Sequence, residues 1–295
     1  MKPQATTSKF FALASASFVL TLLTVIMGSP FIRALHKAYK PIYFWAFGIL
    51  ISAIFILVNV PIFATLLSSV WFLVGIYGEL EKRGSGWKWA SFLSLLGSSV
   101  ILIGGMTYTF VILGINSWDR YVLFLSEAFE GFQKMNPSLK FDTNVLAQQT
   151  PSMLISLLLL ALGNALIFEK RTAKYFKVPY EKIASELKPL EFRLPDAVIW
   201  IFLLALFFSM VNFDIPMLSV IGFNLVNLGV VLFFFQGLAI LEVFFLTMKT
   251  ALFFRVLTYI ILVGYLFVLL SALGLIDYWV DIRSRLRKAQ TVVSN

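Results

Sequence analysis

The sequence contains no cysteine and only one histidine, His36. Without cysteine the chain can form no disulfide, no thiolate metal site and no cysteine nucleophile. One histidine cannot build the usual multi-histidine metal site, so we expect no metal and no cofactor. We interpret His36, in the basic stretch RALHKAYK, as a polar residue of a loop at the membrane interface.

Charge is scarce as well, because 13% of the 295 residues are charged whereas 60% are hydrophobic. A soluble domain usually carries about 25% charged residues. The chain has too little polar surface to coat a globule in water, so lipid must be its solvent. Its apolar runs are long and continuous, as helices that span about 30 Å of hydrocarbon require. We therefore predict an all-α, polytopic transmembrane helical bundle.

The net charge is +9, and one explanation of so basic a chain is that it binds nucleic acid. The basic residues, however, lie in short loops between apolar runs. Positive loops that face an anionic cytoplasmic leaflet explain this charge. We expect the lipid bilayer as the partner and no nucleic acid.

About eight apolar runs are predicted to span the membrane: 10–27, 42–58, 61–78, 89–114, 151–168, 197–212, 217–247 and 252–276. No small-x-small cleavage site follows the first run, so we interpret it as a retained helix rather than a signal peptide. No repeat is evident. We treat 1–295 as one membrane domain, with N-terminal spans over 10–114, a surface segment over 115–150, C-terminal spans over 151–276 and a basic tail over 277–295.

The surface segment differs from the spans in its pattern. Between 119 and 135, charged residues fall at helical spacing on one face and aromatic or aliphatic residues on the other. This pattern predicts an amphipathic helix that lies on the membrane surface or caps the bundle.

The orientation has two solutions. The basic segments 33–40, 79–88 and 169–193 all lie on one side if eight simple spans are assumed, and the charge rule makes that side cytoplasmic. The same count places the basic C-terminus outside, against the rule. Either one span is re-entrant, or the run 217–247 crosses twice around Gln236-Gly237.

Polar side chains gather in the run 217–247. Asn224 and Asn227 are one turn apart, and Glu242 follows Asn224 by five helical turns, so these three share a face of a continuous helix. Gln236 points about 120° away from that face, by the same helical geometry. Such residues either contact a ligand or ion, or they form interhelical hydrogen bonds with Glu242 near a headgroup. No enzymatic motif is evident, and we expect no enzyme.

Three segments of the C-terminal half occur in the order seen in a known family. They are FRLPDAVIWIF (192–202), NLVNLGVVLFFFQGLAILEVFFL (224–246) and LGLIDYWVDIRSRL (273–286). With them the chain resembles the YybS-like family of uncharacterised bacterial integral membrane proteins, a domain of unknown function. That family is thought to be distantly similar to the substrate-binding S components of energy-coupling-factor transporters.

The resemblance has implications at the N-terminus. In S components an Ala-x-x-x-Ala face of the first helix docks the transmembrane coupling subunit. Ala12 and Ala16 match this pattern, and small residues one turn apart allow close helix approach in any membrane protein. They are our candidate docking residues for another integral membrane subunit.

At the C-terminus, the pattern predicts a helix that leaves the membrane at the interface. Asp277, Trp279, Asp281 and Arg283 lie where the apolar run meets the basic tail, which continues through Arg285, Arg287 and Lys288. Trp and Tyr favour headgroup depth, and basic residues favour the phosphates. Asp277 and Arg283 could instead tie the last helix to a neighbouring loop.

Three hypotheses of function follow. The first is a non-enzymatic membrane protein that binds or transports a small molecule in the manner of an S component, through Asn224, Asn227, Gln236 and Glu242. The second is a membrane scaffold or assembly partner without a ligand. An intramembrane enzyme is the third.

Overall fold

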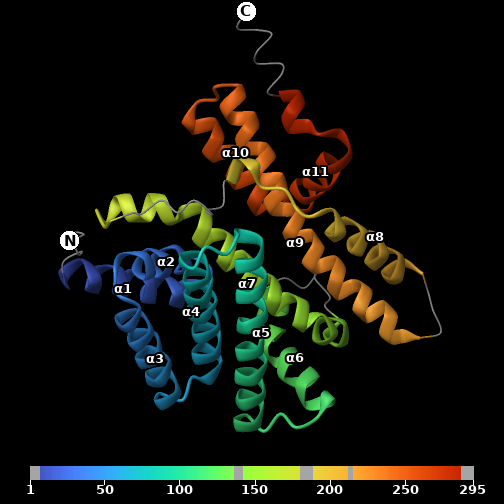
Figure 1. Ribbon diagram of the computed structural model, residues 1–295. Coiled ribbons are helices and arrows are strands. Elements are labelled where there is room, and N and C mark those ends of the chain that lie inside the picture. The colour runs from blue at the N-terminus through green and yellow to red at the C-terminus, as the bar shows by residue number, and fades with distance from the viewer. Residues whose placement is uncertain (1–6, 136–141, 180–188, 212–214, 287–295) are drawn as a thin grey trace, which may run out of the picture. The chain divides into compact units, whose positions relative to one another are not determined.

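The computed structural model describes residues 7–135, 142–179, 189–211 and 215–286, and in these ranges every regular element is a helix (Figure 1). The helices are α1 (Thr7–Leu23), α2 (Ser29–Ala38), α3 (Pro41–Leu57), α4 (Pro61–Lys82), α5 (Trp87–Ile112), α6 (Trp118–Met135), α7 (Thr143–Tyr175), the 3₁₀ turn η1 (Pro189–Glu191), α8 (Asp196–Met210), α9 (Pro216–Thr247), α10 (Leu252–Gly264) and α11 (Phe267–Val280). The predicted all-α class is confirmed.

Local signals set several helix starts. Pro41, Pro61 and Pro216 each open a helix, where a proline lacks only an N–H that would have no partner within the helix. Asp142 caps α7, because its carboxylate accepts hydrogen bonds from the backbone N–H groups of Asn144 and Val145. The helix α7 therefore starts eight residues before the predicted span at 151.

The eight predicted apolar runs correspond to α1, α3, α4, α5, α7, α8, α9 and the pair α10–α11. In the described part of the chain, α4, α5, α7 and α9 are long and apolar enough to cross a membrane, and the bent pair α10–α11 is a fifth candidate. The helices α1, α3 and α8 are apolar but shorter, at 15 to 17 residues. The chain is thus an all-helical protein with several membrane-spanning candidates, and the count of eight stays a prediction.

Two sequence interpretations are wrong. The basic stretch at 33–40 is not a loop: most of it belongs to α2, whose residues 32–36 are buried. The run 217–247 does not turn back at Gln236-Gly237, because α9 is one continuous helix of 32 residues. The predicted amphipathic segment at 119–135 is the helix α6. Among its residues whose exposure the structure describes, none is buried; its place on the membrane surface stays a prediction.

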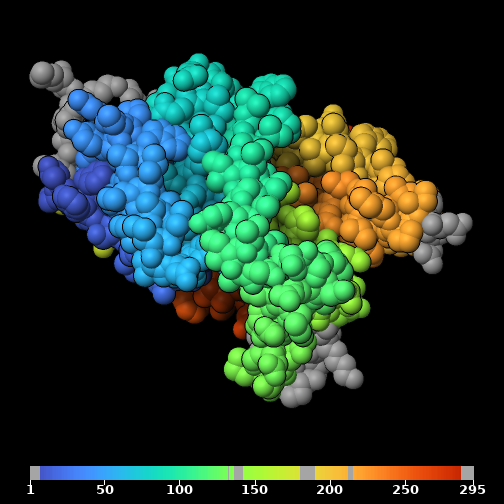
Figure 2. Space-filling model, turned by 90° about the horizontal axis from the view of Figure 1, so that it is seen from below, coloured from blue at the N-terminus to red at the C-terminus, as the bar shows by residue number. Residues whose placement is uncertain are grey.

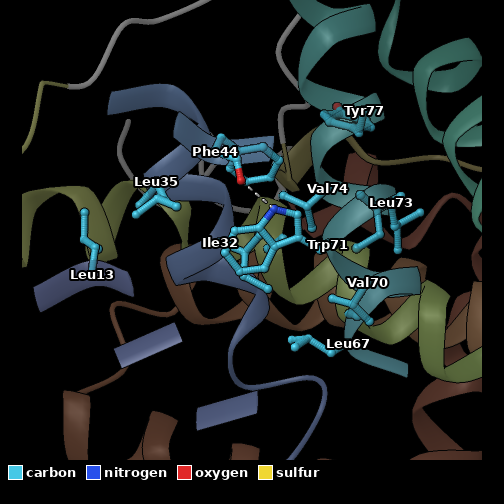
Figure 3. Close-up of a cluster of buried hydrophobic side chains, with 14 of the residues drawn as sticks. Leu13, Ile32, Leu35, Phe44, Leu67, Val70, Trp71, Leu73, Val74 and Tyr77 are labelled. Carbon is cyan, nitrogen blue, oxygen red and sulfur yellow. Dashed lines mark hydrogen bonds between the residues drawn. The ribbon is translucent and has the colours of Figure 1, made fainter. Parts of the chain in front are cut away.

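The chain divides into two compact units, residues 1–186 and 187–295, and each is described by itself. In the first unit α4 packs against α2, α3, α5 and α7. Its core is centred on Trp71, which stacks on Phe44 and donates a hydrogen bond from Nε1 to the Phe44 carbonyl oxygen at 3.1 Å (Figure 3). Gly75 lets α3 approach, since a Cβ there would overlap the rings of Phe44 and Trp45.

The helix α5 lies at the edge of this unit, and few of its residues are buried. Figure 2 shows its surface in teal and green. Large apolar side chains cover that surface; among them Trp89, Phe92, Leu96, Val100 and Ile103 are 56–66% exposed. Such a surface is suited to lipid and not to water.

In the second unit α9 is central and packs against α8 and α11. Glycines bring the helix backbones together. A Cβ at Gly222 would overlap the α8 backbone at Ser209, a Cβ at Gly237 would overlap the carbonyl oxygen of Leu270, and a Cβ at Gly274 would overlap that of Phe233. Small residues at such interfaces are the usual means of close packing in membrane helices.

We predict that Gly237→Ala destabilises the second unit by about 1–3 kcal/mol, the usual cost of overpacking. The obstructing atom belongs to the α11 backbone and cannot rotate away. Gly264→Ala is the matched control, because nothing lies within 4 Å of a Cβ at Gly264. Thermal unfolding of the purified variants in detergent measures the difference. Equal melting temperatures for the two variants would contradict the packing of α9 on α11.

Candidate functional site

The three polar residues of the predicted ligand face lie on one side of α9. Because α9 is continuous, Asn224, Asn227 and Glu242 lie on one side of it, and all three are half-buried. Gln236 lies on a different side and is 1% exposed. The four predicted residues therefore divide into a half-buried face of three and one core residue.

Gln236 holds three segments of the second unit together. Its Nε2 donates to the carbonyl oxygen of Gly274 in α11 at 2.9 Å. Its Oε1 accepts from the backbone N–H of Leu194, two residues before α8, at 3.1 Å. Both ends of this amide are thus bonded within the protein, and Gln236 joins α9 to α11 and to the segment before α8.

Glu242 has a partner on α10. The hydroxyl of Tyr259 donates to Glu242 Oε2 at 2.5 Å. Close by, Arg255 donates to the carbonyl oxygens of Phe245 and Thr250, each at 2.9 Å, and so caps the end of α9. Glu242 lies five residues before that end, about 8 Å along the helix axis at 1.5 Å per residue.

Asn224 donates from Nδ2 to the carbonyl oxygen of Val220, one turn earlier on the same helix, at 2.8 Å. This bond uses one of the two amide hydrogens of the side chain. The Asn224–Asn227–Glu242 face thus combines a carboxylate with two carboxamides at different depths of one helix.

The C-terminal residues predicted as an interface anchor form two groups. Asp277 and Arg283 are 1% and 8% exposed, and Arg283 Nη2 and Nε bind Asp277 Oδ2 at 2.8 and 3.0 Å. Arg283 Nη1 also donates to the carbonyl oxygen of Phe192 at 2.7 Å, which ties the end of α11 to the segment before α8. Trp279 is 59% exposed and Asp281 is exposed. Arg287 and Lys288 lie outside the described residues.

The candidate docking residues Ala12 and Ala16 lie on the outward side of the first helix. Leu13, Ala14 and Ser17 of α1 are buried in the first unit. Ala12 is exposed and Ala16 is half-buried, so the face predicted for docking is not occupied by the core of this unit.

A cluster of charged side chains in the first unit escaped the sequence analysis. Arg33 of α2 binds Glu81 of α4 through Nη2 and Glu169 of α7 through Nε, the latter at 2.9 Å. Lys37 binds Glu169 at 3.0 Å and lies 3.9 Å from Glu81. These four side chains are 1–6% exposed, and their formal charges cancel. We call them the ion-pair cluster.

His36 lies beside this cluster and is not the interfacial loop residue that the sequence suggests. It is fully buried, and its Nε2 pairs with Glu79 Oε1 at 2.8 Å. Burial, and then the nearby charges of Lys82, Arg33 and Lys37, lower the pKa of His36 to about 2. The ring is therefore neutral at physiological pH. Gly78 allows this packing, because a Cβ there would overlap the His36 ring and Arg33.

One sequence signal could have revealed the cluster. Arg33, His36 and Lys37 have the i, i+3, i+4 spacing of one helical face, which is not expected of a loop. Glu81 and Glu169 each follow an apolar run at the same end as this basic segment in the predicted topology. What the sequence does not contain is the packing that brings both acids to one arginine.

These features define a class: a helical membrane protein whose buried polar groups join its helices in two units. A family model described as "Predicted membrane protein (DUF2232)" matches residues 6–278. The chain belongs to this family, and the resemblance to a family of uncharacterised membrane proteins is confirmed. No curated protein and no solved structure matches the chain.

We predict that Arg33→Gln lowers the stability of the first unit by about 3–5 kcal/mol, the usual cost of removing one partner of a buried ion pair. The substitution leaves two buried carboxylates with Lys37 alone. Lys134→Gln is the control, since its pair with Glu130 is exposed and such pairs contribute about 0–1 kcal/mol. Thermal unfolding compares the two. A silent Arg33→Gln would show that the ion-pair cluster does not hold these helices.

We also predict that stability falls as the pH drops below about 6.5, the ordinary histidine pKa. The pKa of His36 is lowered in the folded state, so the unfolded chain takes up a proton that the folded chain does not. Above pH 6.5 His36 is neutral in both states and its titration does not lower the free energy of unfolding. At pH 5 its protonation in the unfolded chain lowers that free energy by about 2 kcal/mol. His36→Gln, which cannot titrate, should flatten this part of the profile of melting temperature against pH. An unchanged slope in His36→Gln would assign the pH dependence to other groups.

Proposed function

We propose that this protein is a non-enzymatic, multi-pass subunit of the bacterial plasma membrane that binds a small molecule, in the manner of a transporter S component. The observation that carries the proposal is the Asn224–Asn227–Glu242 face on the continuous helix α9. Polar groups inside a membrane segment are costly, and they usually face a protein interior or a water-filled path. No cofactor is needed for this role.

The chemistry of the face favours a small polar ligand. Two carboxamides offer both donors and acceptors, and a carboxylate offers acceptors and a charge. Glu242 keeps one oxygen, Oε2, on the hydroxyl of Tyr259. A ligand with an amine or several hydroxyl groups would complement this set.

The outward face of α1 supports the subunit part of the proposal. Ala12 and Ala16 leave room for a helix of another integral membrane protein to approach closely. In the proposed role that partner is a transmembrane coupling subunit, as the family resemblance implies.

A scaffold without a ligand is the second candidate, and Gln236 favours it. Both ends of the Gln236 amide are bonded within the protein, to Gly274 and Leu194, so we leave this residue out of the proposed site. If the other three side chains also serve only packing, the protein would act through its surface alone.

Native mass spectrometry of the purified protein tests the proposal. We expect a retained small molecule in the wild type and its loss in Glu242→Gln, with a milder loss in Asn227→Ala. The glutamine carbonyl still accepts from Tyr259, so the melting temperature of Glu242→Gln should stay unchanged.

Glu242→Leu is the comparison variant, because it removes the hydrogen bond and should lower the melting temperature as well. Retention of the ligand by Glu242→Gln would sink the site assignment. A wild type that carries a second protein and no small molecule would favour the scaffold instead.

A further inference from the structure

We propose that α10 and α11 form a re-entrant pair, which enters and leaves the membrane on the same side. The C-terminal residues 281–286 then lie on the side of the membrane where α8 begins. This inference concerns only the second unit and does not depend on the proposed function.

The geometry of the pair argues against a single crossing. The axes of α10 and α11 are bent by 97° at a break of at most four residues. The two helices have 13 and 14 residues, which is about 20 Å each at 1.5 Å per residue. The 97° bend turns the second helix away from the axis of the first, so the two lengths do not add up to one crossing of the roughly 30 Å hydrocarbon core.

The exposed side chains of α10 indicate that this helix is immersed in lipid. Leu252, Phe253 and Phe254 are 59–77% exposed, and Val256, Leu257, Ile260, Ile261 and Val263 are 41–58% exposed. Its polar members face the protein instead: Arg255 binds carbonyl oxygens at the end of α9, and Tyr259 binds Glu242. A helix that lies on a membrane surface turns its polar face toward water, so this inverted arrangement suits a helix that dips into the apolar layer.

The hydrogen bonds of α11 show where the pair returns. The helices α8 and α9 pack antiparallel, because Gly229 meets Phe202 and Gly222 meets Ser209. The start of α8 and the end of α9 are therefore on the same side. Arg283 and Tyr278 bind the segment just before α8, through Arg283 Nη1 on the Phe192 carbonyl oxygen at 2.7 Å and Arg193 Nη2 on the Tyr278 carbonyl oxygen at 3.5 Å.

The charge distribution agrees with this path. From the basic segment at 169–193, two crossings by α8 and α9 return the chain to its starting side. A re-entrant pair keeps it there, and the basic residues Arg283 and Arg285 then share a side with Arg193, just before α8. The conflict between the C-terminus and the positive-inside rule disappears.

Single cysteines in this cysteine-free chain test the pair directly. Ser284→Cys reports the C-terminal segment, and Glu191→Cys reports the side where α8 begins. Met217→Cys reports the opposite side, and all three positions are at least partly exposed. Intact cells are treated with a membrane-impermeant maleimide, and permeabilised cells show that every position can react.

We expect Met217→Cys to be labelled in intact cells, and Ser284→Cys to behave like Glu191→Cys, with labelling only after permeabilisation. The comparison between Ser284 and Glu191 holds even if the whole protein has the reverse orientation. Labelling of Ser284→Cys together with Met217→Cys would mean that the pair crosses the membrane. Identical labelling of Glu191→Cys and Met217→Cys would remove the crossing by α8 and overturn the proposal as well.

Discussion

The apolar core of a bilayer offers no hydrogen-bond partner to a backbone amide or to a polar side chain, so each such group must find its partner within the protein. The helices of this chain satisfy their own backbones. Several buried polar side chains instead join one part of the chain to another. Arg33 meets Glu81 and Glu169, Gln236 bridges Gly274 and Leu194, and Asp277 meets Arg283.

These pairs also specify which helices meet. A bilayer provides little hydrophobic drive between helices, so close backbone contact and polar bonds must set the arrangement. In the first unit the ion-pair cluster joins α2 to α4 and α7, and Gly78 gives His36 and Arg33 their room. In the second unit Gly237 and Gly274 bring α9 and α11 together at the point where Gln236 forms its bridge. A change at either place would alter the packing of several helices at once.

The proposed binding face is less buried than the polar groups that join the helices. Gln236 and the ion-pair cluster are nearly inaccessible, as a group that serves only packing should be. Asn224, Asn227 and Glu242 are half-buried along a helix that is otherwise apolar. The proposal places the binding function on that half-buried face and the docking function on α1. In the proposed re-entrant arrangement, Arg193 before α8 and Arg283 and Arg285 after α11 lie on the same side of the membrane.

The one-dimensional pattern determined the class, the approximate limits of the helices and the common face of the three polar residues of α9. Each of these follows from hydrophobicity and from the 3.6-residue period, which are local properties. The pairing of charges was decided only in three dimensions. The spacing of Arg33, His36 and Lys37 is typical of a helical face, but nothing local shows that this face is buried, because its burial depends on two acids 48 and 136 residues from Arg33. The role of Gln236 and the bend between α10 and α11 were likewise set by tertiary contacts, since both depend on which backbone lies opposite.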